Sequence, residues 1–263
     1  MTTLKDIFEA YENRKFLMVE PGGNQGDSMI YAGARKLADE VGLNFESVYC
    51  GPQAVPPKCD QTTIIYLHGG GGFCTWWNWT PRLLKALRVQ NPHNIIIVGP
   101  TTIARQEWYL KKYMPRPEKI IFFARERTTA KYVKHLFFPK HTAMDHDTAL
   151  FLKMGDGYLT PLLDGCEPEE LFTFLGIRED PESLDKIPES IDPSKFDHVI
   201  DPCQTKSWAY FHVKASEIVT NRSHSAILGM ILKKPTTIFP GRYHKNRSIW
   251  EYSLRDNGVK WID

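Results

Sequence analysis

Residues Thr220 to Pro240 read TNRSHSAILGMILKKPTTIFP, a stretch that predicts the end of one strand, a helix and a second strand within about twenty residues. The apolar positions that follow Asn221 are spaced for one buried helix face, and Asn221 can cap that helix by accepting a backbone N–H. Thr236 to Phe239 predicts the second strand. A buried strand, a helix and another strand in this order form the repeating unit of a parallel α/β sheet.

Two cations stand in the first turn of the predicted helix, where stability alone disfavours them. Arg222 and His224 lie where the unpaired N–H groups of a helix carry roughly half a positive elementary charge. A bound anion would remove this conflict, because the backbone N–H groups, the guanidinium and the imidazole would all point at it. A solvated arginine and a satisfied histidine would explain the same residues without a ligand.

The alternation of strand and helix extends toward the N-terminus. Buried strands are predicted at 15–19, 62–67, 95–98 and 119–123, with helical sequence between them, as in a doubly wound parallel sheet. In such sheets ligands bind at the carboxyl ends of the strands. These ends carry two glycine-rich turns and a pair of arginines: Pro21-Gly22-Gly23-Asn24-Gln25-Gly26-Asp27, His68-Gly69-Gly70-Gly71-Gly72, and Arg125 with Arg127.

Composition limits the classes of function. The chain has 263 residues, 42% of them hydrophobic, which suits one large packed domain or two small ones. The net charge is only +2, so a nucleic-acid-binding stripe is not indicated and an anion site has to come from local clustering. No long apolar run precedes Lys15, so neither a signal peptide nor a membrane span is expected, and a cytoplasmic protein is predicted.

The cysteines predict reduced thiols. They are odd in number and far apart, and none forms a C-x-x-C pair, which argues against a disulfide framework and against a zinc site. The five are Cys50, Cys59, Cys74, Cys166 and Cys203.

Several of these stretches, taken together and in order, resemble the polysaccharide pyruvyltransferase family. The resemblance rests on Arg222-Ser223-His224 before an apolar helix, on the Gly-Asn-x-Gly-Asp-like turn that ends at Asp27, on the glycine run after His68, and on Phe122-Phe123-Ala124-Arg125-Glu126. It covers most of residues 15–254. No single motif is specific alone.

The resemblance implies an α/β fold of two Rossmann-like halves facing a cleft, the glycosyltransferase-B-like arrangement, with an unusually short second half. The sequence becomes acidic and proline-containing between Gly155 and Asp197. We therefore expect the junction near Gly157, with an N-terminal domain at 1–156 and a C-terminal domain at 157–263.

The family implies transfer of pyruvate from phosphoenolpyruvate onto two hydroxyls of a sugar, with a cyclic ketal and phosphate as products. Phosphoenolpyruvate would be a co-substrate, no further cofactor is expected, and the acceptor would be a sugar or a lipid-linked oligosaccharide, with peripheral membrane association left open. Phosphoenolpyruvate brings about three negative charges, which Arg125, Arg222, Lys245 and a protonated His224 together could balance.

The matching motifs also indicate which residues are expected to be catalytic and which are expected to bind substrate. His224 is expected to be the acid that protonates the methylene carbon, and Asp27 is the candidate base for the attacking hydroxyl. The remaining positions are expected to bind substrate, with Arg242 and His244 close enough to be confused with Lys245: Arg125, Arg222, Ser223, Lys245, Asn24, Gly26, Gly70 and Gly71.

Three interpretations stay open. Asp145-His146-Asp147 has the D-x-D form by which many nucleotide-sugar transferases hold a metal, but we interpret it as structural and expect no metal site. Trp76, Trp77 and Trp79 suit a sugar-stacking face and core packing about equally. A nucleotide-sugar glycosyltransferase and a non-catalytic anion- or sugar-binding module are the alternatives to pyruvyl transfer.

Overall fold

The computed structural model describes residues 2–104, 117–136, 141–163, 171–204 and 208–263, and the helices and strands within them form two compact units. Unit 1 comprises residues 1–23 and 33–151, and unit 2 comprises residues 24–32 and 152–263. The division therefore falls inside helix α2 (Gln25–Val41), whose first turns group with the second unit. The domain junction expected near Gly157 stays a prediction.

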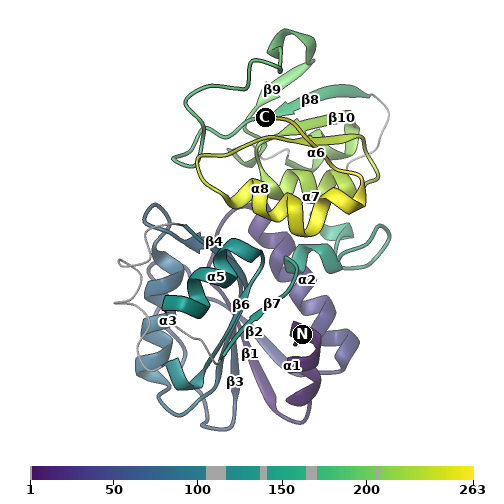
Figure 1. Ribbon diagram of the computed structural model, residues 1–263. Helices are drawn as coiled ribbons and strands as arrows, with labels where there is room; N and C mark the ends of the chain where they lie inside the picture. The colour runs from purple at the N-terminus through teal and green to yellow at the C-terminus, as the bar shows by residue number, and fades with distance from the viewer. Residues whose placement is uncertain (1, 105–116, 137–140, 164–170, 205–207) are drawn as a thin grey trace. The chain divides into compact units, whose positions relative to one another are not determined.

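Unit 1 is built on a parallel sheet of seven strands in the order β2-β1-β3-β5-β6-β7, with β4 paired to the end of β5 (Figure 1). The strands are β1 (Lys15–Glu20), β2 (Asn44–Tyr49), β3 (Ile64–Leu67), β4 (Gly70–Phe73), β5 (Ile96–Ile103), β6 (Ile120–Ala124) and β7 (Thr142–Met144). Its other helices are α1 (Leu4–Ala10), α3 (Trp79–Gln90) and α5 (Arg127–Leu136).

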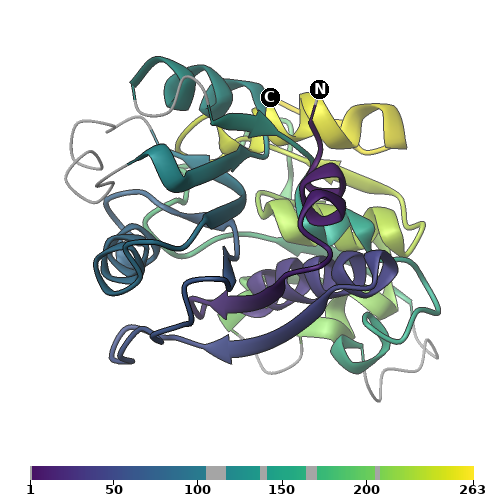
Figure 2. The same cartoon turned by 90° about the horizontal axis from the view of Figure 1, so that it is seen from below.

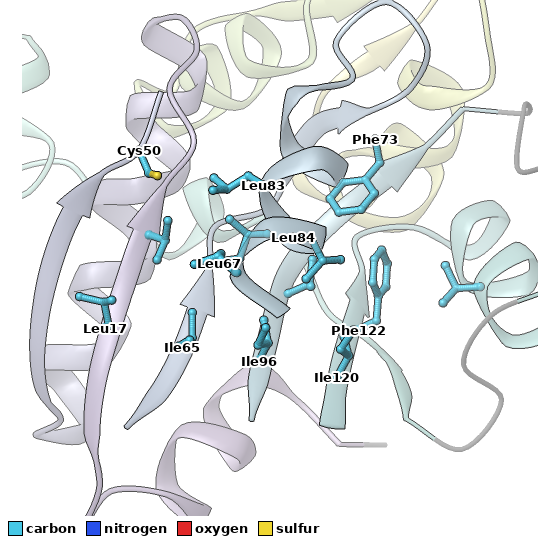
Figure 3. Packing of buried hydrophobic residues seen from close by; sticks show 14 of the residues in the cluster. Leu17, Cys50, Ile65, Leu67, Phe73, Leu83, Leu84, Ile96, Ile120 and Phe122 are labelled. Atoms are coloured by element: carbon cyan, nitrogen blue, oxygen red, sulfur yellow. The ribbon is translucent and has the colours of Figure 1, made fainter. Parts of the chain in front are cut away.

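Helices cover both faces of this sheet because its strands are apolar on both sides (Figures 1 and 2). Leu17 and Val19 of β1 pack with α3 through Leu83 and Leu84, in the cluster that Figure 3 shows. The alternate residues of β1 belong to a second cluster on the opposite face, which includes Leu4 and Phe8 of α1 and Leu37 of α2. The period of two along β1 thus divides the core between the helical layers.

Unit 2 has a parallel sheet of five strands in the order β12-β11-β10-β8-β9. The strands are β8 (Phe172–Gly176), β9 (His198–Ile200), β10 (Ala215–Thr220), β11 (Thr236–Ile238) and β12 (Lys260–Trp261). Its helices are α6 (Trp208–Lys214), α7 (Ser223–Ile231) and α8 (Lys245–Ile249), which continues as a π-helical turn at Trp250–Leu254. The α/β fold with two Rossmann-like halves is thereby confirmed.

Both sheets share one topological feature that locates ligand sites. In each unit the first strand lies between the second and the third, so the chain reverses direction across the sheet between β1 and β3 and again between β8 and β10. Ligands of open α/β sheets bind outside the carboxyl ends of the strands at such a reversal. In unit 2 this point is bordered by the segments that begin at Ile177 and Asn221.

The glycine run after His68 differs from the expected turn. Gly70–Phe73 forms strand β4, which pairs with the second half of β5. A side chain on Gly69 would place its Cβ 2.0 Å from the carbonyl oxygen of Pro100, so the two backbones can approach only because the residue is glycine. Gly70 adopts a φ of 130°, which L side chains rarely adopt.

Candidate functional site

Hydrogen bonds tie together the segments that follow β8 and β10 at the reversal point of unit 2. The Thr220 hydroxyl donates to the Gly176 carbonyl at 2.7 Å and accepts from the backbone N–H of Arg222 at 3.0 Å. The side-chain oxygen of Asn221 accepts from the backbone N–H of Arg178 at 2.8 Å. The position of Arg222 is therefore set by the backbone of both strands.

The expected capping role of Asn221 is wrong. Helix α7 begins at Ser223 with Arg222 as its N-cap residue, and no side chain caps it. Asn221 cannot cap because its oxygen is already bonded to Arg178 across the strand ends. The helix thus starts with a cation at the N-cap position.

Asn246 holds the first turn of α7 in place, a role that sequence reasoning missed. Its amide nitrogen donates to the carbonyls of Asn221 at 2.6 Å and Phe239 at 3.0 Å, and its oxygen accepts from the Ser223 hydroxyl at 2.8 Å. The candidate Ser223 is buried and engaged in this framework. The only sequence signal for Asn246 is its position directly after the basic residue Lys245.

A chain of alternating charges runs along this edge of the sheet. Arg222 contacts Asp201 and lies 3.1 Å from Asp180, and Arg178 makes two hydrogen bonds to the same Asp180, at 3.0 and 2.8 Å. Arg178 also lies 3.2 Å from Glu182, which pairs with Lys245. All six side chains are at most one-tenth exposed, in the order Asp201, Arg222, Asp180, Arg178, Glu182, Lys245.

The carboxylates in this chain of ion pairs change the net charge that the cations alone would give the site. Three cations face three carboxylates, so the group as a whole carries no net charge. Burial raises the pKa of Glu182, but the charges of Lys245 and Arg178 outweigh burial and hold the pKa below its ordinary 4.5. Burial likewise raises the pKa of Asp180, and the hydrogen bonds and charge of Arg178 hold it below 3.8. Both carboxylates are ionised near neutral pH.

One donor of the Arg222 guanidinium has no acceptor among the described residues. The Nε atom is buried and makes no hydrogen bond, although the terminal nitrogen of the same side chain contacts two carboxylates. Buried donors are almost always paired in native structures. An unpaired donor at a helix N-terminus is consistent with a missing anionic or carbonyl acceptor.

His224 lies against the first turn of α2, within unit 2. A Cβ on Gly26 would lie 2.2 Å from the Nδ1 atom of His224, so the imidazole packs on the bare backbone of the glycine. Asn24 caps that turn by accepting from the Gly26 N–H at 2.9 Å, and the Asp27 carboxylate accepts from the Asn24 N–H at 2.9 Å. The Asn-x-Gly-Asp spacing is thus a capping box whose glycine, the third residue, makes room for the histidine.

Cys203 lies within reach of the charges of this site. Burial raises the pKa of its thiol to about 11, with Asp201 and Asp27 adding to the rise and Arg222 and Arg178 opposing it. The thiol is therefore neutral near pH 7. None of the described cysteines, Cys50, Cys59, Cys74 and Cys203, forms a disulfide, while Cys166 lies outside the described residues.

Lys245 is distinguished from its basic neighbours by its partner. It is buried and paired with Glu182. The backbone of Arg242 donates to the Glu182 carbonyl at 3.1 Å, and its guanidinium donates to the Pro181 carbonyl at 3.3 Å. Lys245 is thus the basic residue of this segment whose charge enters the chain of ion pairs.

Arg125, Gly70 and Gly71 belong to unit 1, whereas the candidates described above belong to unit 2. Arg125 is 1% exposed, donates to Asp147 at 2.6 Å and to the Thr102 hydroxyl at 2.8 Å. The Asp145 carboxylate accepts from the backbone N–H groups of Leu4 at 2.6 Å and His146 at 2.8 Å. Both carboxylates of Asp145-His146-Asp147 therefore have partners within unit 1.

The three tryptophans after β4 divide between two environments. Trp79 packs against the core of unit 1, and its indole N–H donates to the Cys50 carbonyl at 3.0 Å. Trp76 and Trp77 are 36% and 43% exposed in the segment between β4 and α3. Core packing therefore accounts for Trp79, whereas Trp76 and Trp77 present aromatic surface near the carboxyl end of the sheet.

Comparison with known proteins gives a family and a similar structure. A family model described as polysaccharide pyruvyl transferase matches residues 24–241, more than half of the chain. The crystal structure of protein KP1_0663 from Klebsiella pneumoniae subsp. pneumoniae NTUH-K2044, described as functional uncharacterized, has a TM-score of 0.69 at 20% identity over 100% of both chains. At this identity the likeness is one of fold. No curated protein matches the chain.

None of the helices in the described part of the chain combines the length and the apolar character that a membrane span requires.

Proposed function

The chain belongs to the polysaccharide pyruvyl transferase family, and from this premise we propose that it transfers pyruvate from phosphoenolpyruvate onto two hydroxyls of one sugar in a polysaccharide or its precursor. The products are a cyclic ketal and inorganic phosphate. Phosphoenolpyruvate acts as a co-substrate, without a further cofactor.

The first turn of α7 is the observation that carries this proposal. Arg222 is the N-cap residue, its buried Nε–H has no acceptor within the described residues, and His224 packs against Gly26, so a guanidinium and an imidazole lie at one helix N-terminus. The turn lies at the topological reversal of the unit 2 sheet, where α/β proteins bind ligands. An anionic substrate would supply the acceptor that the Nε–H of Arg222 lacks among the described residues.

The reaction requires a proton to move to carbon. We assign His224 as the acid that protonates the methylene carbon of phosphoenolpyruvate, which leaves an electron-poor centre at the carbon that bears the phosphate. One sugar hydroxyl bonds to that centre, the carbon–oxygen bond to phosphate breaks, and the second hydroxyl closes the ketal. Of the two hydroxyl protons, one replaces the proton given to the methyl group and the other leaves with phosphate.

Asp27 is the proposed base for the attacking hydroxyl. Its carboxylate accepts from the Asn24 N–H and lies in the same turn as Gly26, which contacts His224. An acid and a base contributed by α7 and α2 would thus act from neighbouring turns of unit 2. Enzymes accelerate reactions when they hold an acid and a base in a productive geometry beside the substrate.

Charge attraction alone contributes less to substrate binding than the number of cations suggests. Arg222 and Lys245 are already paired with carboxylates of unit 2, and Arg125 is paired with Asp147 in unit 1. The N-terminus of α7, together with His224 when it is protonated, therefore adds positive charge beyond these ion pairs. Directional hydrogen bonds from Arg222 then supply specificity for the planar carboxylate or the phosphate.

Phosphate release with phosphoenolpyruvate and a panel of acceptor glycosides tests the proposal. Arg222→Ala should weaken phosphoenolpyruvate binding roughly ten- to a hundredfold by calorimetry, because a charge-assisted contact contributes on the order of 1.5–3 kcal/mol. Arg222→Lys should restore part of it, since the lysine lacks the planar fork. Arg255→Ala, at an exposed arginine of the same unit, serves as the control.

His224→Gln separates proton donation from binding. It should retain phosphoenolpyruvate affinity and lose most turnover, because glutamine can donate a hydrogen bond but cannot supply a proton to carbon. Unchanged turnover in this variant, or no phosphate release with any glycoside, would contradict the proposal.

A further inference from the structure

Asp201 joins the three segments that follow β8, β9 and β10. Its carboxylate accepts from the backbone N–H of Glu179 at 3.1 Å and from that of Cys203 at 3.1 Å, and it also contacts the terminal nitrogen of Arg222. The side chain is 1% exposed. Because two of its three donors are backbone groups, Asp201 keeps its position independently of Arg222.

Asp180, the other carboxylate beside Arg222, is arranged differently. Both of its oxygens bond to Arg178, and the backbone N–H of Glu182 donates to it at 2.9 Å, whereas Arg222 reaches it at 3.1 Å. Asp180 is therefore primarily the partner of Arg178. Asp201 is the fixed acceptor that remains for Arg222.

We propose that Asp201 is a positioning residue that holds the Arg222 guanidinium in the orientation in which it binds the anionic substrate, an inference that rests on the proposed function. A free arginine side chain loses rotamer entropy when a ligand fixes it. Asp201 removes that loss in advance by binding the terminal nitrogen, while the Nε–H has no acceptor within the described residues. The carboxylate thus increases substrate affinity although it carries the same sign of charge.

A competing role for Asp201 would change the affinity for anions in the opposite direction. If Asp201 merely competed with the substrate for Arg222, removal of its charge would tighten binding of anions. If it oriented Arg222, removal would weaken binding. The sign of the change in affinity therefore decides between the two roles.

Asp201→Asn is the direct test, with phosphoenolpyruvate and inorganic phosphate as separate titrants in calorimetry. We expect affinity for phosphoenolpyruvate to fall by about tenfold, since a charge-assisted contact becomes misaligned. Asp197→Asn is the matched control, because Asp197 bonds to Thr173 on the exposed side of the same unit. The control should bind as the wild type does.

A double-mutant cycle shows whether Asp201 acts through Arg222. In an Arg222→Ala background, Asp201→Asn should change phosphoenolpyruvate affinity less than twofold, because the group that it orients is gone. A purely structural role for Asp201 would instead give the same loss in both backgrounds. Tighter binding by Asp201→Asn, or equal losses in the two backgrounds, would overturn the inference.

Asp180→Asn gives a second measurement should Asp201→Asn fold poorly. It should reduce phosphoenolpyruvate affinity by no more than about threefold, because Arg222 keeps Asp201 as its anchor. Tighter binding in this variant would support competition and reject positioning. If the wild-type protein bound phosphate but not phosphoenolpyruvate, the proposed function would be rejected. The double-mutant cycle of Asp201 and Arg222, measured with phosphate, would still test the role of Asp201.

Discussion

A Cβ on Gly26 would lie 2.2 Å from Nδ1 of His224, so the imidazole occupies the space that any other side chain at position 26 would take. In an unconstrained helix, replacing glycine by alanine raises stability by about 0.5–1 kcal/mol. At position 26 the new methyl group has to displace His224 or shift the first turn of α2. A substitution at position 26 therefore tests whether the position of His224 matters for the reaction.

Gly26→Ala should therefore reduce pyruvyl transfer by at least about tenfold while the protein stays folded, because small misplacements of a catalytic group reduce rates strongly. Phosphate release measures turnover, and circular dichroism checks the fold. Gly157→Ala is the control, since a Cβ there meets nothing within 4 Å. Normal turnover in Gly26→Ala would show that the position of His224 is not needed for the reaction.

Arg125→Ala should reduce stability more than substrate binding. It leaves the carboxylate of Asp147 buried without a cation, which costs about 3–5 kcal/mol when one member of a buried pair is removed. The double variant Arg125→Met with Asp147→Leu should recover much of that loss. Urea unfolding measures both.

Arg127→Ala provides the comparison for Arg125, because Arg127 is exposed two residues later. It should unfold as the wild type does. If Arg125→Ala kept wild-type stability but bound phosphoenolpyruvate more weakly, Arg125 would be a substrate ligand instead of a residue held for structure.

Trp76→Ala and Trp77→Ala should weaken binding of the sugar acceptor without changing the affinity for phosphoenolpyruvate. Aromatic stacking contributes about 0.5–1.5 kcal/mol beyond area burial, so a rise in acceptor KM of about three- to tenfold is expected from each. Trp77→Phe should retain most of the affinity. Val89→Ala on α3 is an exposed control, and an unchanged acceptor KM in both alanine variants would assign these indoles no role in acceptor binding.

His212 should make stability depend on pH in a defined window. Burial lowers its pKa from 6.5 to about 4, and the contact of its Nδ1 with the Trp208 carbonyl opposes burial only in part. Between these two values the unfolded chain binds a proton that the folded protein does not. The contribution of His212 to the free energy of unfolding should therefore be constant above pH 6.5. It should fall by up to about 1.4 kcal/mol per pH unit as the pH decreases toward 4.

His212→Phe should remove this component of the pH dependence, because a phenyl ring can take the place of the imidazole beside Phe174 and Trp208 and does not titrate. Thermal unfolding from pH 7 to pH 4 measures the effect. His93→Gln, at an exposed histidine, should leave the profile unchanged. A His212→Phe profile parallel to that of the wild type would place the proton uptake elsewhere.

Transfer is expected to survive a metal chelator. The developing charge on phosphate would be stabilised by hydrogen bonds from Arg222 and by the positive charge of His224 and the N-terminus of α7, whereas a nucleotide-sugar transferase would rely on a D-x-D metal. Asp147 is bound to Arg125, and Asp145 accepts backbone N–H groups, so Asn substitutions there should reduce the unfolding free energy. Loss of activity with a chelator and recovery with manganese or magnesium would favour the glycosyltransferase alternative.

The sequence by itself determined the elements that depend on local patterns. Apolar runs with helical spacing between them predicted the parallel strands, and the strand at Ile120–Ala124 and the helix at Ser223–Ile231 lie where these patterns indicated. The unfavourable cations at Arg222 and His224 also marked the first turn of α7. These signals are visible because neighbouring residues in the chain create them.

Only the tertiary structure supplied the partners of those cations. Asp180, Glu182 and Asp201 belong to the segments after β8 and β9, where the sequence is acidic without periodicity, and Asn246 follows β11. A parallel sheet brings the carboxyl ends of strands together across long intervals of sequence, and spacing along the chain does not record which ends become neighbours. The same reason explains why the contact between Gly26 and His224 emerged only from the fold.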